Sequence, residues 1–137
     1  MSKNVFSRFS AITKSTNFEE VLKKSPEILK SHGFGVLYDL DMKKILKQKI
    51  DVDTHNRRIL GVCNPKLAHS IIEIDTNFGT FAPCGLYFEQ KNETDGVSIT
   101  LNDPEETVAP FLNSDTSKDL KKAGEGLDAV FNDFKTL

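Results

Sequence analysis

One short segment constrains the fold of this chain more than any other: residues 58–65, with the sequence RILGVCNP. Residues 59–63 predict a β-strand that is apolar on both faces, which is typical of a central strand covered on each side. Asn64 and Pro65 then predict the start of a helix, because asparagine caps free amides and proline suits the first helical position. We therefore expect a buried strand that passes directly into a helix.

Hydrophobic periodicity predicts the remaining elements. The expected strands span residues 4–14, 35–40, 59–63, 85–90 and 96–101, and the last two form a hairpin. Long amphipathic helices are expected after Asn17 and over residues 120–134, with short helices after Asp41, Asn64 and Asp103. Pro26 predicts either a kink in the first long helix or the start of a second one, and Gly33 predicts its end. The pattern β-α-β-β-β-β-α predicts an α+β fold with a five-stranded, mainly antiparallel sheet.

The size and charge of the chain exclude several classes of protein. Its 137 residues suit one domain spanning residues 1–137, and 18 basic against 20 acidic residues give a net charge of −2. This balance provides no basic surface for nucleic acid and no polybasic patch for a membrane. No run of apolar residues is long enough to span a bilayer, and the first residues lack the apolar core of a secretory signal. We therefore expect a cytoplasmic protein.

Both cysteines of the chain lie beside residues that fix local structure. Cys63 directly precedes Asn64 at the strand-to-helix junction, and Cys84 follows Pro83 in the loop before the next strand. If the two strands are neighbours, these four residues meet near the start of a helix. The sequence therefore predicts a ligand-binding cleft lined by Cys63, Asn64, Pro83 and Cys84, in which the two cysteines are also the candidate catalytic residues.

Cys63 has two opposite interpretations. A sulfur close to a helix N-terminus can have a low pKa and act as a reactive thiolate, and Lys66, Arg57 or Arg58 would add positive charge. Alternatively, Cys63 is a small buried apolar residue that packs against the helix, since free cysteine is among the most buried residue types. The sequence leaves both open.

The other polar candidates have structural explanations. His69 is expected to be exposed, His32 to pack or cap at the end of the first helix, and His55 to lie in a polar loop. Asp39 and Asp41 lie on one face of a strand, where paired carboxylates can divide acid and base roles, but Asp41 is expected to cap the next helix. No metal site, cofactor motif or complete catalytic set is predicted, which leaves open whether the chain is an enzyme.

Several short motifs together resemble the prokaryotic family catalogued as domain of unknown function 302. They are HGFGVL at residues 32–37, DLD at 39–41, RILGVCNP at 58–65 with Ala68, Pro83-Cys84, and Asp103-Pro104-Glu105. The resemblance covers nearly the whole chain. It implies a fold similar to that of the TATA-binding protein and a dimeric assembly, and it implies no activity.

Three functions follow from these patterns, and the least supported is a carrier of a metal or haem, since no Cys-x-x-Cys-His attachment run is present. The first is a homodimeric module that binds a small molecule or a protein partner in the cleft around Cys63 and Cys84, because the second apolar face of the central strand needs a cover. The alternative is a thiol-dependent enzyme or redox sensor, with Cys63 as a low-pKa thiolate and Cys84 as its resolving partner.

Overall fold

The computed structural model describes residues 5–137, so residue 4 of the first expected strand lies outside the described part. The chain forms a five-stranded antiparallel sheet in the order β1-β5-β4-β3-β2. The strands are β1 (Ser10–Ile12), β2 (Gly35–Asp41), β3 (Asn56–Cys63), β4 (Cys84–Gln90) and β5 (Ser98–Thr100). The predicted α+β fold and the order of its main elements are confirmed.

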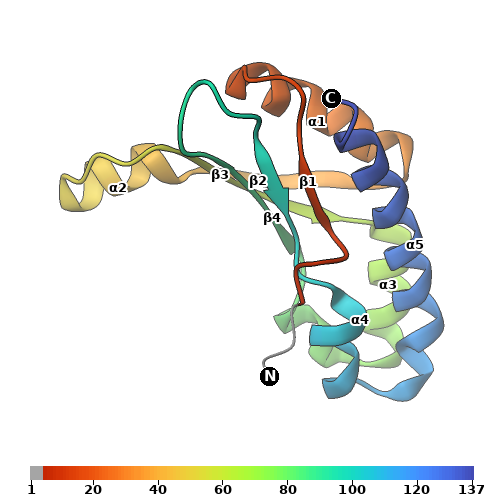
Figure 1. Cartoon of the computed structure of the whole chain (residues 1–137). Helices are drawn as coiled ribbons and strands as arrows, with labels where there is room; N and C mark the ends of the chain where they lie inside the picture. Colours follow the sequence, from red (N-terminus) through yellow and green to blue (C-terminus); the bar gives the residue numbers. More distant parts are fainter. Residues whose placement is uncertain (1–4) are drawn as a thin grey trace, which may run out of the picture.

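Two long helices pack on one face of the sheet (Figure 1). They are α1 (Phe18–Ser31) and α5 (Ser117–Phe134), the latter at the end of the chain. Asn17 caps α1 as expected, because its side chain accepts a hydrogen bond from the amide of Glu20 over 3.1 Å. Gly33 follows the helix in the left-handed conformation, with φ of +85°. This conformation lets the chain turn sharply from α1 into β2.

Pro26 neither ends α1 nor starts a new helix. The helix runs from Phe18 to Ser31 with Pro26 inside it. Ser25, which would have capped a second helix, instead donates its hydroxyl to the carbonyl of Val21 over 2.7 Å and is fully buried. The hydroxyl is thus satisfied within the first two turns of a continuous helix.

Shorter helices fill the connections. They are α2 (Met42–Ile50), α3 (Pro65–Ile74) and α4 (Pro104–Thr107), with 3₁₀ turns η1 (Thr76–Thr80), η2 (Ala109–Phe111) and η3 (Ser114–Thr116). α3 and α4 lie on the same side as α5, whereas α2 projects from the far end of β2 and β3 on the opposite side (Figure 1). Among the described helices, none is both long and apolar enough to cross a membrane.

The buried side chains form two separate clusters. The larger one joins the sheet to α1 and α5 and includes Leu60, Leu86 and Phe88. The smaller one consists of Ile71, Phe78, Val108 and Leu120, which come from α3, η1, the α4–η2 connection and α5. Helix α5 contributes to both clusters and therefore holds the two parts of the fold together.

Within the described part of one chain, helices cover only one face of β3, so the cover expected on its second face stays a prediction. Leu60 and Val62 are buried under the helices, but Ile59 and Cys63 on the other face are only half-buried. Gly61 lies between them and leaves room for the ring of Tyr38 on the neighbouring strand. Among residues 5–137, the apolar residues of that second face are thus covered in part by a side chain of the same sheet and otherwise stay partly exposed.

Candidate functional site

The junction between β3 and α3 has the local structure that the sequence predicts. Asn64 is the N-cap of α3, and its Oδ1 atom accepts a hydrogen bond from the amide of Leu67 over 3.2 Å. Pro65 occupies the first helical turn. Gly33 packs against Asn64, because a Cβ atom on Gly33 would lie 3.3 Å from the Asn64 Nδ2 atom. The cap therefore also fixes where the α1–β2 turn meets this junction.

A cavity of ≈ 40 Å³ lies beside this junction. It is lined by Cys63, Asn64, Pro83 and Cys84, the four residues that the sequence placed around a cleft. The other lining residues are apolar: Phe34, Val62, Leu67, Ala68, Ile71, Phe78, Ala82, Pro104, Leu120, Ala123 and Leu127. The cavity separates the larger core cluster from the smaller one, since its walls take side chains from both.

The two cysteines border the same cavity but are not directly opposite in the sheet. Cys84 pairs with Val62 across the β3–β4 ladder, and Cys63 pairs with Gly35 across the β2–β3 ladder. Because successive side chains of a strand point to opposite faces, Cys63 and Val62 lie on opposite faces of β3. Both cysteines are free thiols, and both are half-buried.

Burial acts on both thiols in the direction opposite to thiolate formation. It raises the pKa of Cys63. Burial, and to a lesser degree the neighbouring Cys63, raise the pKa of Cys84 to about 11. Burial therefore acts against the low-pKa thiolate expected as one alternative for Cys63, and that alternative stays a prediction. Loss of hydration in the apolar surroundings disfavours the charged form of the thiol.

The arginines that were candidates for activating Cys63 are engaged elsewhere. Arg58 forms a two-pronged ion pair with Asp39, over 2.5 and 3.0 Å, and reaches Asp41 over 3.5 Å. Asp41 also caps α2 by accepting from the amide of Lys44 over 3.0 Å. The two aspartates thus hold an arginine and a helix start, and their oxygens are not arranged as an acid and base pair.

The three histidines are far apart in the fold. His32 contacts Asp133 at the end of α5 over 2.7 Å, and His69 lies exposed on α3, 3.6 Å from Glu73. His55 contacts Glu89 on β4 over 2.9 Å. No group of three or more His, Cys, Asp or Glu side chains within residues 5–137 is arranged to hold a metal ion.

A polar cluster on the uncovered face of the sheet was missed from the sequence. One carboxylate oxygen of Glu89 receives the hydroxyl of Tyr87 over 2.9 Å and contacts His55 over 2.9 Å. Arg57 lies 3.6 Å from the same oxygen, and its Nε atom lies 3.1 Å from the His55 Nε2 atom. The hydrogen bond from His55, followed by that from Tyr87, lowers the pKa of Glu89. The sequence signal available for this cluster is the spacing of Tyr87 and Glu89, two residues apart on one strand, which places both side chains on the same face of β4.

The apolar walls of the cavity were also missed as site residues. Ala68, Ile71, Leu120 and Leu127 belong to the helical stripes that predict α3 and α5, and a stripe does not show whether its side chains fill space or surround a void. Only the packing of α3 against α5 reveals the gap.

These features define an α+β protein in which an antiparallel sheet, covered on one face by two long helices, carries an apolar cavity at a strand-to-helix junction. The family model described as "Domain of unknown function DUF302" matches residues 10–134, and the chain belongs to this family. The resemblance drawn from the short motifs is thereby confirmed.

A solved structure shares the fold. The crystal structure of an uncharacterised conserved DUF302 protein from Bacillus stearothermophilus matches with a TM-score of 0.82 and 24% sequence identity. The match covers 92% of this chain and 96% of that one. No curated protein matches the chain.

Proposed function

We propose that this protein is a homodimeric cytoplasmic module that binds a compact, largely apolar small molecule in the cavity between its two core clusters. The observation that carries the proposal is the composition of the cavity wall. Twelve apolar residues and two protonated thiols surround the space, and Asn64 is the polar side chain at its edge. Burying the apolar surface of a ligand against such a wall is favourable. A charged ligand would lose its hydration there without gaining a partner of opposite charge.

The raised pKa values of the cysteines fit this role. A neutral thiol behaves as a small, polarizable apolar group and not as a nucleophile. Cys63 and Cys84 thus contribute to the wall in the protonated form. Free, reduced cysteines are also the normal state in the cytoplasm, which supports that compartment.

The volume of the cavity limits the ligand. A space of ≈ 40 Å³ accepts one or a few water-sized groups, so anything larger requires α3 and η1 to move away from α5. Two polar contacts hold that side of the cavity: Ser70 donates to Asp119 over 2.5 Å, and the amide of Asn113 donates to Asp75 over 2.8 Å. The Asn113–Asp75 contact is exposed and the Ser70–Asp119 contact is only part-buried, so water can replace them when this side moves.

Titration with apolar probes of increasing size tests the proposal. We expect xenon, and then benzene or toluene, to cause saturable shifts in the amide NMR signals of Ala68 and Ile71. The variant Ala123→Leu should abolish these shifts, because the new side chain fills the cavity from α5. Ala129→Leu is the matched control, since Ala129 is also half-buried on α5 but does not line the cavity.

The proposal is wrong if none of these probes gives saturable shifts in the wild-type protein, or if Ala123→Leu and Ala129→Leu bind them equally well. Circular dichroism of both variants must match the wild type, because an added side chain in a packed site can strain the fold.

A further inference from the structure

Helix α2 contributes to neither core of the protein. It spans Met42–Ile50 and has no buried residue. Its apolar side chains follow the helical spacing i, i+3, i+4, i+8, with Met42, Ile45, Leu46 and Ile50 on one stripe. Ile50 is 62% exposed, and Val52 just beyond the helix is 42% exposed. An isolated helix of nine residues is marginal in water, so a helix like α2 normally depends on packing against another surface.

The second unpartnered surface is the face of the sheet opposite α1 and α5. Residues paired across antiparallel strands share a face, and the ladders place Tyr87, Ile59 and Leu40 in one row. Ile12 and Tyr38 belong to the rows on either side. Ile12 is 69% exposed, Leu40 40% and Tyr38 37%, and the fully buried core of a protein interface is typically more apolar than the rest of a protein surface.

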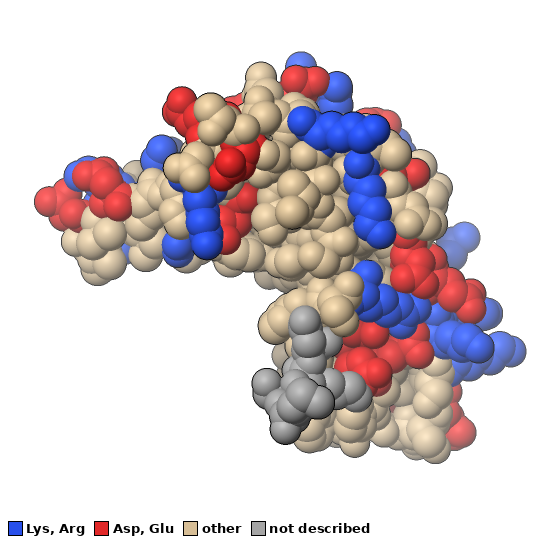
Figure 2. Space-filling model, viewed as in Figure 1, with Lys and Arg blue, Asp and Glu red and all other residues tan. Residues whose placement is uncertain are grey.

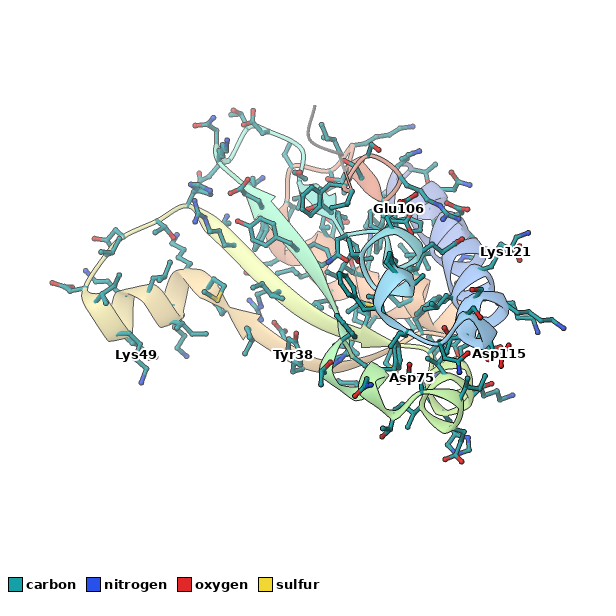
Figure 3. All side chains as sticks on the ribbon, turned by 90° about the horizontal axis from the view of Figure 1, so that it is seen from below. Tyr38, Lys49, Asp75, Glu106, Asp115 and Lys121 are labelled. Atoms are coloured by element: carbon teal, nitrogen blue, oxygen red, sulfur yellow. The ribbon has the colours of Figure 1, made fainter. Side chains whose placement is uncertain are left out.

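The two surfaces cannot cover each other within one chain. α2 continues outward from β2 and β3, away from the sheet, as Figure 1 shows. In Figure 3, Lys49 near the end of α2 is far from the body of the molecule, and Tyr38 lies at the base of this projection. Figure 2 shows the same projection beside a notch in the outline and a mostly uncharged area over the sheet.

We propose that a second copy of this chain docks here, with α2 of each copy lying on the uncovered sheet face of the other. A two-fold axis then covers both surfaces at once, because each copy supplies one helix and one sheet face. This inference specifies the dimer in the proposed function and rests on that part of it alone, not on the ligand.

The charges favour the same arrangement. Lys43, Lys44 and Lys49 give α2 a positive surface and have no ion pair among the described residues. In the turn between β4 and β5, at the border of the sheet face, the carboxylates of Glu93 and Asp95 outnumber the single Lys91. Opposite charges facing each other across an interface increase the association rate and fix the orientation.

Two single variants and their mixture test the proposal. Ile50→Glu alters only the helix and Ile12→Glu only the sheet face, and both side chains are already exposed in one copy, so neither change disturbs the core. We expect the wild type to be a dimer by light scattering, and each variant to weaken the dimer at least about 30-fold, as removal of a central interface side chain does. Phe111→Glu, at a side chain 72% exposed on η2, should leave the dimer unchanged.

The mixture distinguishes exchanged helices from any other dimer. A mixed pair of Ile50→Glu and Ile12→Glu copies retains one intact contact, between the wild-type helix of one copy and the wild-type face of the other. Homodimers of either variant retain none. We therefore expect the equimolar mixture to dimerise more tightly than either variant alone.

Three results would overturn this inference: a wild-type chain that stays monomeric at about 100 μM, variants that dimerise as tightly as wild type, or a mixture no tighter than its components. The first result would assign the two surfaces to a different protein. Binding of xenon and benzene by the monomeric variants is measured in parallel, because the cavity lies on the helix-covered side. Loss of the dimer with retained probe binding would leave the ligand part of the proposed function intact.

Discussion

The ring of Tyr38 on β2 lies against Gly61 on β3, its direct partner across the ladder. A Cβ atom at Gly61 would fall within the ring, so these two residues fit together only because position 61 has no side chain. Gly61 therefore explains how a strand with apolar residues on both sides persists without helices on its second face. An aromatic ring over a glycine protects backbone that would otherwise be open to water.

Replacing Gly61 with alanine should displace Tyr38 and destabilise the protein by about 1–3 kcal/mol, the usual cost of inserting a methyl group into a packed site. Urea unfolding measures the change. Gly85→Ala is the matched control, since Gly85 pairs with Gly61 and its Cβ would lie 3.7 Å from Ile59, an ordinary contact. A Gly61→Ala protein as stable as Gly85→Ala would contradict the role given to the ring.

Much of the architecture follows from local rules that the sequence displays. Asn17, Asp41 and Asn64 each predict a helix start, and each one caps a helix with its side chain. These signals are local, because a cap depends on three or four consecutive residues. The predicted strand boundaries are less accurate: the first strand shrinks to Ser10–Ile12, and the third extends back to Asn56.

The candidate site could be predicted only in part. Cys63, Asn64, Pro83 and Cys84 meet at one cavity because β3 and β4 are neighbours, as the pattern allowed. The direction of the thiol pKa shifts could not be predicted. It depends on the side chains that α3, η1 and α5 place around the sulfurs, and these are distant in the sequence. The cluster around Glu89 was missed because its members His55 and Arg57 meet Tyr87 and Glu89 only through the pairing of β3 with β4.

The thiols should react only in alkaline solution. Because burial raises the pKa of Cys84 to about 11, we expect its alkylation by iodoacetamide in the folded protein to rise only toward that pH. In urea the same thiol should titrate near its ordinary value of 9.0. Mass spectrometry of the modified peptides measures each cysteine separately. A midpoint below pH 8 for either thiol in the folded state would restore the thiolate hypothesis.

The same shift makes stability depend on pH. A pKa that is higher in the folded state means that the folded protein holds the proton more tightly. The resulting stabilisation is complete below pH 9 and is lost as the pH rises toward 11. We expect the free energy of unfolding to fall by about 2 kcal/mol more over this range in the wild type than in Cys84→Ala. Equal slopes for the two proteins would show that Cys84 is solvated.

Glu89 should stabilise the protein at neutral pH. Its pKa is lowered chiefly by the hydrogen bond from His55, so its contribution is present above its ordinary pKa of 4.5 and is lost as the pH falls below that value. We expect Glu89→Gln to cost about 1 kcal/mol at pH 7, and the difference from wild type to shrink in acid. Urea unfolding at several pH values provides the measurement. A difference that is independent of pH would mean that the charge of Glu89 has no role.

Arg8 ties the segment before β1 to two helices. It donates to Asp128 on α5 over 3.0 and 3.2 Å, to Glu105 on α4 over 2.9 Å, and to Asp103 over 3.3 Å. Its guanidinium also lies 4.8 Å from the ring centre of Phe9. The bond to Asp128, with those to the other carboxylates, raises the pKa of Arg8, so the side chain stays charged at every pH at which the protein is folded.

Arg8→Ala should therefore destabilise the protein by about 1–2 kcal/mol. Most of that cost comes from Asp103, which is only 5% exposed and would lose its cation while remaining buried. Lys24→Ala is the control, because Lys24 forms an exposed pair with Glu20 within one helix and such pairs contribute about 0.5 kcal/mol or less. If both variants lose the same small amount in urea unfolding, the bonds of Arg8 are no stronger than an ordinary surface pair. If adding Asp103→Asn to the Arg8→Ala protein restores part of its free energy of unfolding, the buried carboxylate is the source of the cost.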